Sequence, residues 1–114
     1  MLILIYGIPE SVPSNEQKDL RDKIQNRVAE ILNIQELIKP IFVEIIPSRF
    51  SDSAGLFAQI YLDEKEKEAQ SKSGQIKATV CATIKDFATR KIQPCWMVGV
   101  FCSVEDFLFS EIEF

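Results

Sequence analysis

The fold is decided by a short apolar stretch, Pro40-Ile41-Phe42-Val43-Glu44-Ile45-Ile46-Pro47. Prolines bound the stretch on both sides, and its β-branched and aromatic residues are typical of a β-strand. One similar apolar run, Leu2–Tyr6, precedes it, and two more follow it, Leu56–Leu62 and Cys95–Cys102. Ile41 lies 39 residues after Leu2, and Cys95 lies 39 residues after Leu56. This spacing predicts a β-α-β unit that is used twice.

Two amphipathic segments connect the strands of the two halves. The first has apolar residues at helical spacing, namely Leu20, Ile24, Val28, Ile31 and Leu32. It begins with Ser14-Asn15-Glu16-Gln17, which has the form of a capping box, so we expect a helix over about 15–33. The second segment has such a stripe at Ala69, Ile76, Val80, Ile84 and Phe87. It predicts a helix over about 66–90, with a kink or a late start at Gly74.

The length and the composition indicate one globular domain over residues 1–114. The chain is 46% hydrophobic and 26% charged, which is enough apolar material for a core. Together with the order of the elements, this predicts an α+β fold. We expect a four-stranded mixed sheet with two helices on one face.

The charge and the residue types exclude several classes of function. A net charge of -4 without a basic cluster argues against binding to nucleic acid or to anionic membranes. The sequence has no His, so a His triad or a His–metal site is excluded. It also has neither metal-ligand spacing nor a glycine-rich phosphate loop. We therefore expect no metal and no cofactor.

The cysteines and the N-terminal run predict a cytoplasmic protein. Three cysteines, at 81, 95 and 102, form no C-x-x-C pair, which favours free thiols in a reducing compartment. The run Met1–Tyr6 lacks a basic leader and is too short for a signal peptide or a membrane span.

The C-terminal segment 103–114 has apolar residues that a monomer of this size would struggle to cover. They are Val104, Phe107, Leu108, Phe109, Ile112 and Phe114. Contiguous exposed apolar surface usually marks an interface, so we expect the segment to pack on a neighbouring subunit. An ordinary strand within the chain's own sheet is the alternative.

The whole chain resembles the tautomerase superfamily, and in particular macrophage migration inhibitory factor and small bacterial proteins of that fold. The stretches that carry the resemblance are Val43–Pro47 with the loop to Gly55, Ala88–Pro94 before the last strand, and the aromatic, acidic ending from Glu105 to Phe114. The resemblance implies a homotrimer whose three sheets line a ring, with helices outside and active pockets between subunits.

The same resemblance implies catalysis by an N-terminal proline. An apolar pocket keeps that secondary amine neutral, so that it moves a proton between carbon and oxygen of a keto–enol substrate. In this sequence residue 2 is Leu, and alignment on Gly7 places the proline at or next to Met1. The amine of Met1 could act as the base instead. Otherwise Met1 simply caps the strand.

Three further residues are candidates for binding a small organic ligand. Arg49 could clamp a carboxylate at the pocket mouth, or pair with Asp52 or with solvent. Glu44 is the one charge in its strand, so a buried Glu44 must be paired, protonated or directed at a cavity; an edge-facing, solvated Glu44 is the alternative. Tyr6 could offer its phenol to an oxyanion, although packing at a boundary is the commoner role.

We therefore favour an oligomeric tautomerase-fold protein that binds a small ligand or a partner and lacks the catalytic base. One alternative is a divergent tautomerase with the Met1 amine as base and Arg49 as anchor. The other is a ferredoxin-like dimer that senses a ligand, since that fold has the same order of elements. In the ferredoxin-like fold strands two and three are antiparallel neighbours, joined by a tighter turn than the loop Ser48–Gly55.

Overall fold

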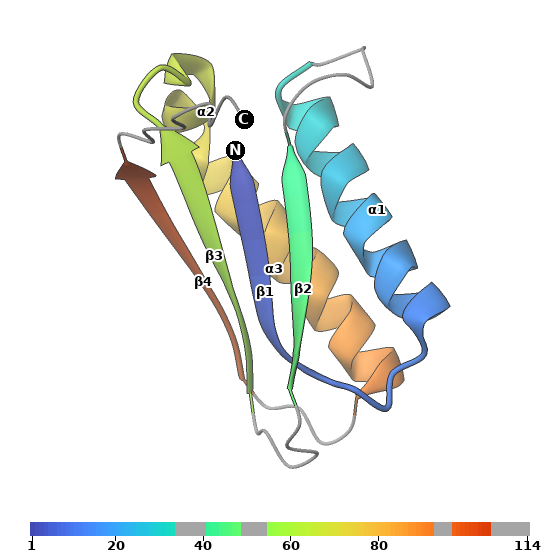
Figure 1. Cartoon of the computed structure of the whole chain (residues 1–114). Helices are drawn as coiled ribbons and strands as arrows, with labels where there is room; N and C mark the ends of the chain where they lie inside the picture. Colours follow the sequence, from blue (N-terminus) through green and yellow to red (C-terminus); the bar gives the residue numbers. More distant parts are fainter. Residues whose placement is uncertain (34–40, 49–54, 93–96, 106–114) are drawn as a thin grey trace, which may run out of the picture.

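The described residues form four strands and three helices; the strands follow the predicted order, and two helices stand where the second predicted helix was expected. The computed structural model describes residues 1–33, 41–48, 55–92 and 97–105. Its elements are β1 (Leu2–Pro9), α1 (Ser14–Ile31), β2 (Phe42–Ser48), β3 (Gly55–Asp63), α2 (Lys67–Ser71), α3 (Ser73–Lys91) and β4 (Met97–Glu105) (Figure 1). Each half is a β-α-β unit, as the sequence predicted.

The four strands form one mixed sheet in the order β2-β1-β3-β4. β1 pairs in parallel with β2 and β3 in parallel with β4, while β1 and β3 are antiparallel. The two β-α-β units therefore meet at their first strands, in the centre of the sheet. Strands β2 and β3 are not neighbours, so the ferredoxin-like alternative is wrong.

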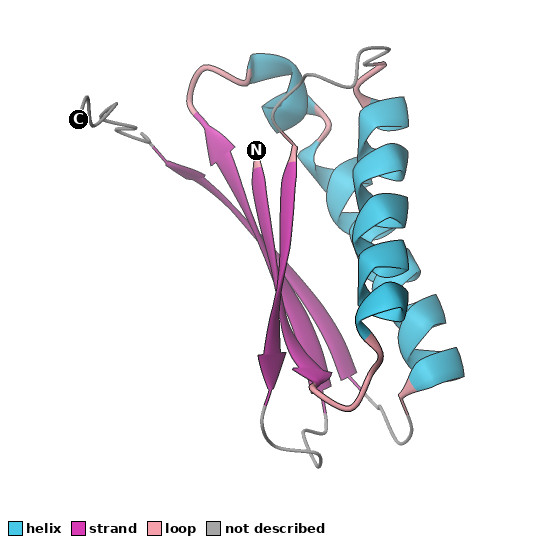
Figure 2. Ribbon diagram, turned by 45° about the vertical axis from the view of Figure 1, so that its right-hand side comes forward, coloured by secondary structure: helices cyan, strands magenta, loops and turns pink. Residues whose placement is uncertain are grey.

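All three helices cover the same face of the sheet (Figure 2). Ile3 and Ile5 of β1 point to this side and are fully buried, together with Ile60 of β3. The helices supply the predicted stripes, including Leu20 and Ile24 of α1. Successive side chains of a strand point to opposite faces of the sheet. Every second residue of each strand therefore lies on the face that the helices do not cover.

The uncovered side of the sheet is called the open face here. Its residues are Leu2, Leu4 and Tyr6 of β1; Phe42, Glu44 and Ile46 of β2; Phe57, Gln59 and Tyr61 of β3; and Met97, Gly99, Phe101 and Ser103 of β4. A continuous apolar run such as Leu2–Tyr6 is typical of a strand that is covered on both faces. Within one chain it is covered on one face.

Strand β1 continues past the apolar run that ends at Tyr6, as far as Pro9. Gly7 adopts φ 97°, and the register between β1 and β2 shifts between Tyr6 and Pro9. A Cβ on Gly7 would lie 2.6 Å from the carbonyl oxygen of Gly55. Glycine is therefore required here by both the backbone angle and the close approach of β3.

The helix ends differ from the predicted ones in three places. No side chain caps the start of α1: Ser14 is already helical, and Gln17 donates to the carbonyl of Val12 at 2.8 Å. The predicted capping box is therefore wrong. α1 ends at Ile31 because Asn33 takes a left-handed φ of 55°. The predicted second helix is divided at Lys72 into α2 and α3, close to the kink or late start expected at Gly74.

None of the helices in the described ranges is both long and apolar enough to cross a membrane.

Candidate functional site

The start of β1 is anchored by an ion pair. The amino group of Met1 lies 2.9 Å from Oε1 of Glu66, and the Met1 side chain is fully buried in the core. The same Glu66 oxygen accepts the N–H of Asp63 at 3.1 Å. In return, the backbone carbonyl oxygen of Asp63 accepts hydrogen bonds from the Glu66 N–H at 3.0 Å and from the Gln70 side-chain amide at 2.9 Å. The turn between β3 and α2 therefore fixes Glu66 against the amine.

This pair bears on the chemistry that the resemblance implies. A general base must be neutral to accept a proton, whereas the pair with Glu66 joins a carboxylate to a charged ammonium. Sequence reasoning missed Glu66, because it lies in the run Asp63–Glu68, where acids and lysines alternate as on any solvated helix start. The sequence carries no signal that distinguishes Glu66 from its neighbours.

Tyr6 lies near the middle of the open face. Its ring stacks on that of Phe57, with centroids 4.9 Å apart and planes inclined by 20°. The two residues are direct partners between β1 and β3. Tyr6 therefore has the packing role that the sequence analysis offered as the commoner one. Its use in ligand binding stays a prediction.

Glu44 lies on the edge strand β2 and is exposed, because the helices cover one face of this strand. It lines a groove of about 430 Å³ between β2 and the first half of α1. The lining residues of this α1–β2 groove are Ser14, Asn15, Gln17, Lys18, Arg21, Glu44 and Ile45. No ion pair joins Lys18, Arg21 or Glu44 to another residue of the described ranges. Glu44 is thus solvated and directed at a groove.

Met1, Tyr6 and Glu44, the predicted site residues within the described ranges, do not form one cluster in a single chain. Tyr6 is five residues beyond Met1, about 16 Å along the strand, and its side chain lies on the opposite face of the sheet. Glu44 and Tyr6 both lie on the open face, on neighbouring strands. Tyr6 pairs with Ile46, two residues beyond Glu44 on β2, and Glu44 itself pairs with Leu4. Arg49 lies outside the described residues.

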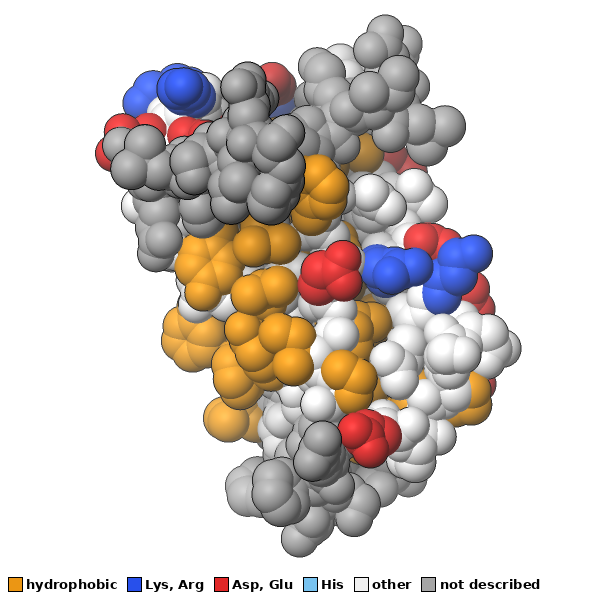
Figure 3. Space-filling view, viewed as in Figure 1, with side chains coloured by type: hydrophobic (Ala, Val, Ile, Leu, Met, Phe, Trp, Pro, Cys, Tyr) orange, Lys and Arg blue, Asp and Glu red, His pale blue; other side chains and the backbone are white. Residues whose placement is uncertain are grey.

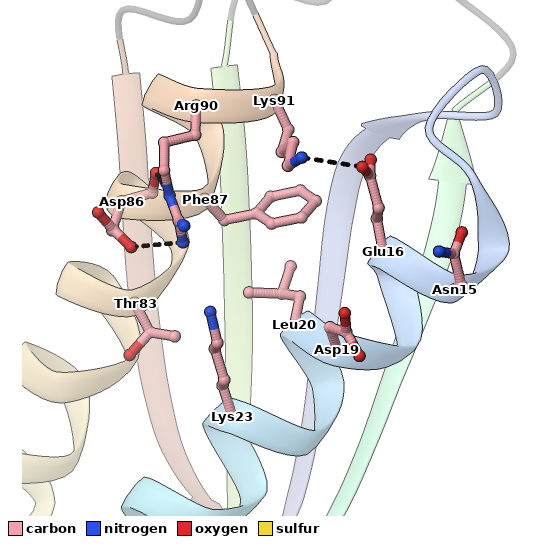
Figure 4. A pocket seen from close by; sticks show the side chains of 10 residues that line it. All are labelled: Asn15, Glu16, Asp19, Leu20, Lys23, Thr83, Asp86, Phe87, Arg90 and Lys91. Atoms are coloured by element: carbon pink, nitrogen blue, oxygen red, sulfur yellow. Dashed lines mark hydrogen bonds and ion pairs between the residues drawn. The ribbon is translucent and has the colours of Figure 1, made fainter.

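A second groove, of about 280 Å³, runs between α1 and α3 (Figure 4). Leu20 and Phe87 point into its centre, and two ion pairs flank it. Lys91 pairs with Glu16 at 2.9 Å, and Arg90 with Asp86 at 2.8 Å. The first pair joins the two helices. The groove is thus a polar contact between two packed helices, and four of its six charged side chains form ion pairs with each other.

The thiols of Cys81 and Cys102 are free and half-buried. Burial raises the pKa of Cys102 above its ordinary 9.0, and the charge of Lys77 opposes this effect. A raised pKa makes a thiol less nucleophilic at neutral pH. Cys102 therefore fits the role of a small apolar side chain in the packing between the sheet and the helices. Among the described residues, no group of His, Cys, Asp and Glu could hold a metal ion.

Apolar side chains gather on the open face over β4, β3 and β1 (Figure 3). Five large ones are 41–66% exposed: Phe42, Ile46, Phe57, Met97 and Phe101. Leu2, Leu4 and Tyr6 lie among them and are half-buried. Contiguous exposed apolar surface of this kind is typical of an interaction site.

Comparison with known proteins agrees with this topology. No protein-family model and no curated protein matches the sequence. Solved structures do match. The macrophage migration inhibitory factor of Toxoplasma gondii is 14% identical, with a TM-score of 0.61 over 94% of this chain and 90% of that chain. A fused 4-OT, solved as an asymmetric trimer, is 12% identical, with a TM-score of 0.63 over 94% and 86%.

A malonate semialdehyde decarboxylase inhibited by 3-bromopropiolate has a TM-score of 0.56 and 12% identity over 94% of this chain and 83% of that chain. These structures are members of the tautomerase superfamily, and at 12–14% identity their similarity to this chain is one of fold. The chain has the tautomerase/macrophage migration inhibitory factor fold, as the resemblance predicted.

Proposed function

We propose that this protein is a homotrimer of tautomerase-fold subunits that binds a small organic ligand between subunits without keto–enol catalysis. The observation that carries the proposal is the apolar open face. Fully covering a large apolar side chain stabilises a protein by about 1.5–3 kcal/mol, and five such side chains are exposed there in one chain. A structural relative of this fold is a trimer.

In this trimer we expect the C-terminal segment 103–114 to pack on a neighbouring subunit. Val104, the last described apolar residue before the end of β4, is 49% exposed. Residues 106–114, which lie outside the described ranges, contain five more apolar residues. Contact with a second subunit would remove these side chains from water.

The ligand is expected to bind at the open face, near Tyr6, Phe57 and Glu44. A stacked aromatic pair favours a flat or apolar ligand body. The negative charge of Glu44 disfavours an acidic ligand and favours a neutral or cationic one. Arg49 stays a candidate for contacts at the mouth of the pocket.

The absence of catalysis is proposed because the Met1 amine pairs with Glu66 and residue 2 is Leu. A second candidate function follows from the same pair. If a ligand displaced Glu66 from the amine, the Met1 amine could act as a weak base in a divergent tautomerase. In that case Glu66 would hold the base in position.

Two measurements test the proposal. Light scattering of the full chain should give the mass of three subunits; a single subunit at high micromolar concentration would refute the homotrimer. An enol–keto ultraviolet assay with a panel of arylpyruvates should show no rate above the buffer. Turnover that disappears when the N-terminus is blocked would instead support the Met1 amine as base. The cytoplasmic location stays a prediction from the cysteines.

A further inference from the structure

We infer that the α1–β2 groove binds a zwitterionic ligand, namely a free α-amino acid with an apolar side chain. Basic side chains of α1 hold its carboxylate, and Glu44 of β2 holds its ammonium group. The inference deepens the proposed ligand binding and rests on it, because Glu44 belongs to both. It does not depend on the homotrimer, since the residues that line the groove belong to one chain.

The α1 wall of the groove is basic. Lys18 and Arg21 are three residues apart on the same side of α1, and both line the groove. Neither forms an ion pair with a described residue, although Asp22 follows Lys18 by one helical turn. A guanidinium group and an ammonium group side by side can both donate hydrogen bonds to one carboxylate. This wall therefore fits the acidic end of an amino acid.

The β2 wall of the groove carries a carboxylate. Glu44 is exposed and is the one charged residue of β2. It lines the same groove as Lys18 and Arg21, yet it forms an ion pair with neither of them. Opposite charges thus line one groove without joining. A small molecule that has both charges can pair with both walls at once.

The groove has the size and the apolar surroundings for such a molecule. Its volume of about 430 Å³ lies within the range of about 300–1,000 Å³ that is typical of small-ligand sites. Ile45 lines it, and Phe42 and Ile46 flank Glu44 on the open face, where they are 59% and 41% exposed. On the side of α1, charged side chains border the apolar patch of the open face (Figure 3). An apolar ligand side chain would cover this patch and leave water.

A ligand with a single charge fits the groove less well. An anion would pair with Lys18 and Arg21, but its negative charge would lie beside that of Glu44. A cation would pair with Glu44, but the two basic side chains would repel it. Like charges at close range oppose binding. A zwitterion avoids both conflicts, so the charges of the groove favour an amino acid.

Calorimetric titration of the full chain tests the class of ligand, with L-phenylalanine as the probe. Two analogues each lack one charge: N-acetyl-L-phenylalanine has no ammonium group, and L-phenylalanine amide has no carboxylate. We expect L-phenylalanine to bind with a saturable heat, and each analogue to bind at least about tenfold more weakly because it loses charged hydrogen bonds. Glycine, which lacks the apolar side chain, should also bind more weakly. An analogue that binds as tightly as L-phenylalanine contradicts the pairing of both charges.

Two substitutions assign the charges of the ligand to the two walls. Glu44→Gln should weaken the binding of L-phenylalanine at least about tenfold but leave that of N-acetyl-L-phenylalanine unchanged, because this analogue has no ammonium group to lose. Arg21→Gln should weaken L-phenylalanine in the same way but leave the amide unchanged. Lys23→Gln and Glu30→Gln are the matched controls, since both residues are exposed on α1 outside the groove. They should bind every probe as the wild type does.

The outcomes separate this inference from the proposed function. A chain of trimeric mass that gives no heat with L-phenylalanine overturns the inference and leaves the homotrimer standing. Binding that Glu44→Gln and Arg21→Gln leave unchanged also overturns it, because the ligand then lies outside the groove. A variant that weakens all the probes equally contradicts the assigned pairing. A single subunit that binds L-phenylalanine with the expected losses supports the inference and refutes the homotrimer.

Discussion

The amino group of Met1 and the carboxylate of Glu66 lie 2.9 Å apart, so the first residue of the central strand is tied to the turn that follows β3. The Glu66 side chain is 27% exposed. Glu66→Gln removes the negative charge but keeps an acceptor for the Asp63 N–H. We expect the free energy of unfolding to fall by about 1 kcal/mol, measured by urea denaturation monitored by circular dichroism.

Glu68→Gln is the matched control for Glu66→Gln. Glu68 forms an ion pair with Lys72 one helical turn away, and its side chain is 63% exposed. Exposed pairs of this kind contribute little, so the urea midpoint should stay close to that of the wild type. Equal losses of stability in the two variants would show that the Met1–Glu66 pair contributes no more to the free energy of unfolding than an exposed ion pair does.

Gly7→Ala should be strongly destabilising. The left-handed φ of Gly7 is costly for any residue with a Cβ, and this Cβ would lie 2.6 Å from the backbone oxygen of Gly55. We expect the free energy of unfolding to fall by about 2–4 kcal/mol, which thermal denaturation would show as a lower Tm.

Gly74→Ala provides the contrasting glycine. Nothing lies within 4 Å of a Cβ at Gly74, which is in the first turn of α3. Alanine has the higher helix propensity, so this variant should gain up to about 1 kcal/mol. If both variants lost stability equally, the close approach of β3 to Gly7 would not explain the effect.

Local patterns predicted most of the fold. The apolar runs placed the four strands, and the stripes of α1 and α3 placed the helices that cover one face. The loop Ser48–Gly55 favoured the topology in which β2 and β3 are apart, and this was confirmed. The capping box failed because Gln17 bonds to Val12 and no side chain caps the helix.

The candidate site was harder to predict, because its features depend on which face of a strand is covered. A run such as Leu2–Tyr6 looks the same whether its second face meets helices of the same chain or another subunit. Glu66 was missed for a different reason. Its partner is the backbone amine of Met1, which no side-chain pattern can indicate.

The raised pKa of Cys102 predicts a loss of stability at alkaline pH. Burial raises the pKa in the folded state above the ordinary 9.0, so the unfolded thiol loses its proton first as the pH rises. The stabilising contribution is complete below about pH 9 and disappears as the pH passes through the folded pKa. Urea midpoints measured from pH 7 to pH 10.5 should fall less in Cys102→Ala than in the wild type.

Lys77→Gln tests the sign of the opposing charge. The positive charge of Lys77 lowers the pKa of Cys102, so its removal should raise that pKa further. Alkylation of Cys102 by iodoacetamide at pH 8.5, followed by mass spectrometry of the peptide, should then be slower. Lys85→Gln, elsewhere on α3, should leave the rate unchanged. Faster alkylation in Lys77→Gln would contradict the lowering effect of the Lys77 charge on the pKa of Cys102.

Phe101→Asp should separate subunits without unfolding them. Phe101 is 58% exposed on the open face, so within one chain the substitution removes little buried apolar area. In the proposed homotrimer the same position would bring an unpaired carboxylate into an apolar interface, where it is costly. Light scattering should therefore show single subunits, while the circular dichroism spectrum stays that of the wild type.

Lys85→Asp is the matched control for Phe101→Asp, since it also introduces an aspartate at an exposed position but lies on α3, away from the open face. It should remain trimeric. Two results would tell against the open face as the interface: a Phe101→Asp protein that keeps the mass of three subunits, or a Lys85→Asp protein that dissociates as readily. Unfolding of Phe101→Asp would instead mean that Phe101 packs within its own chain, which its exposure argues against.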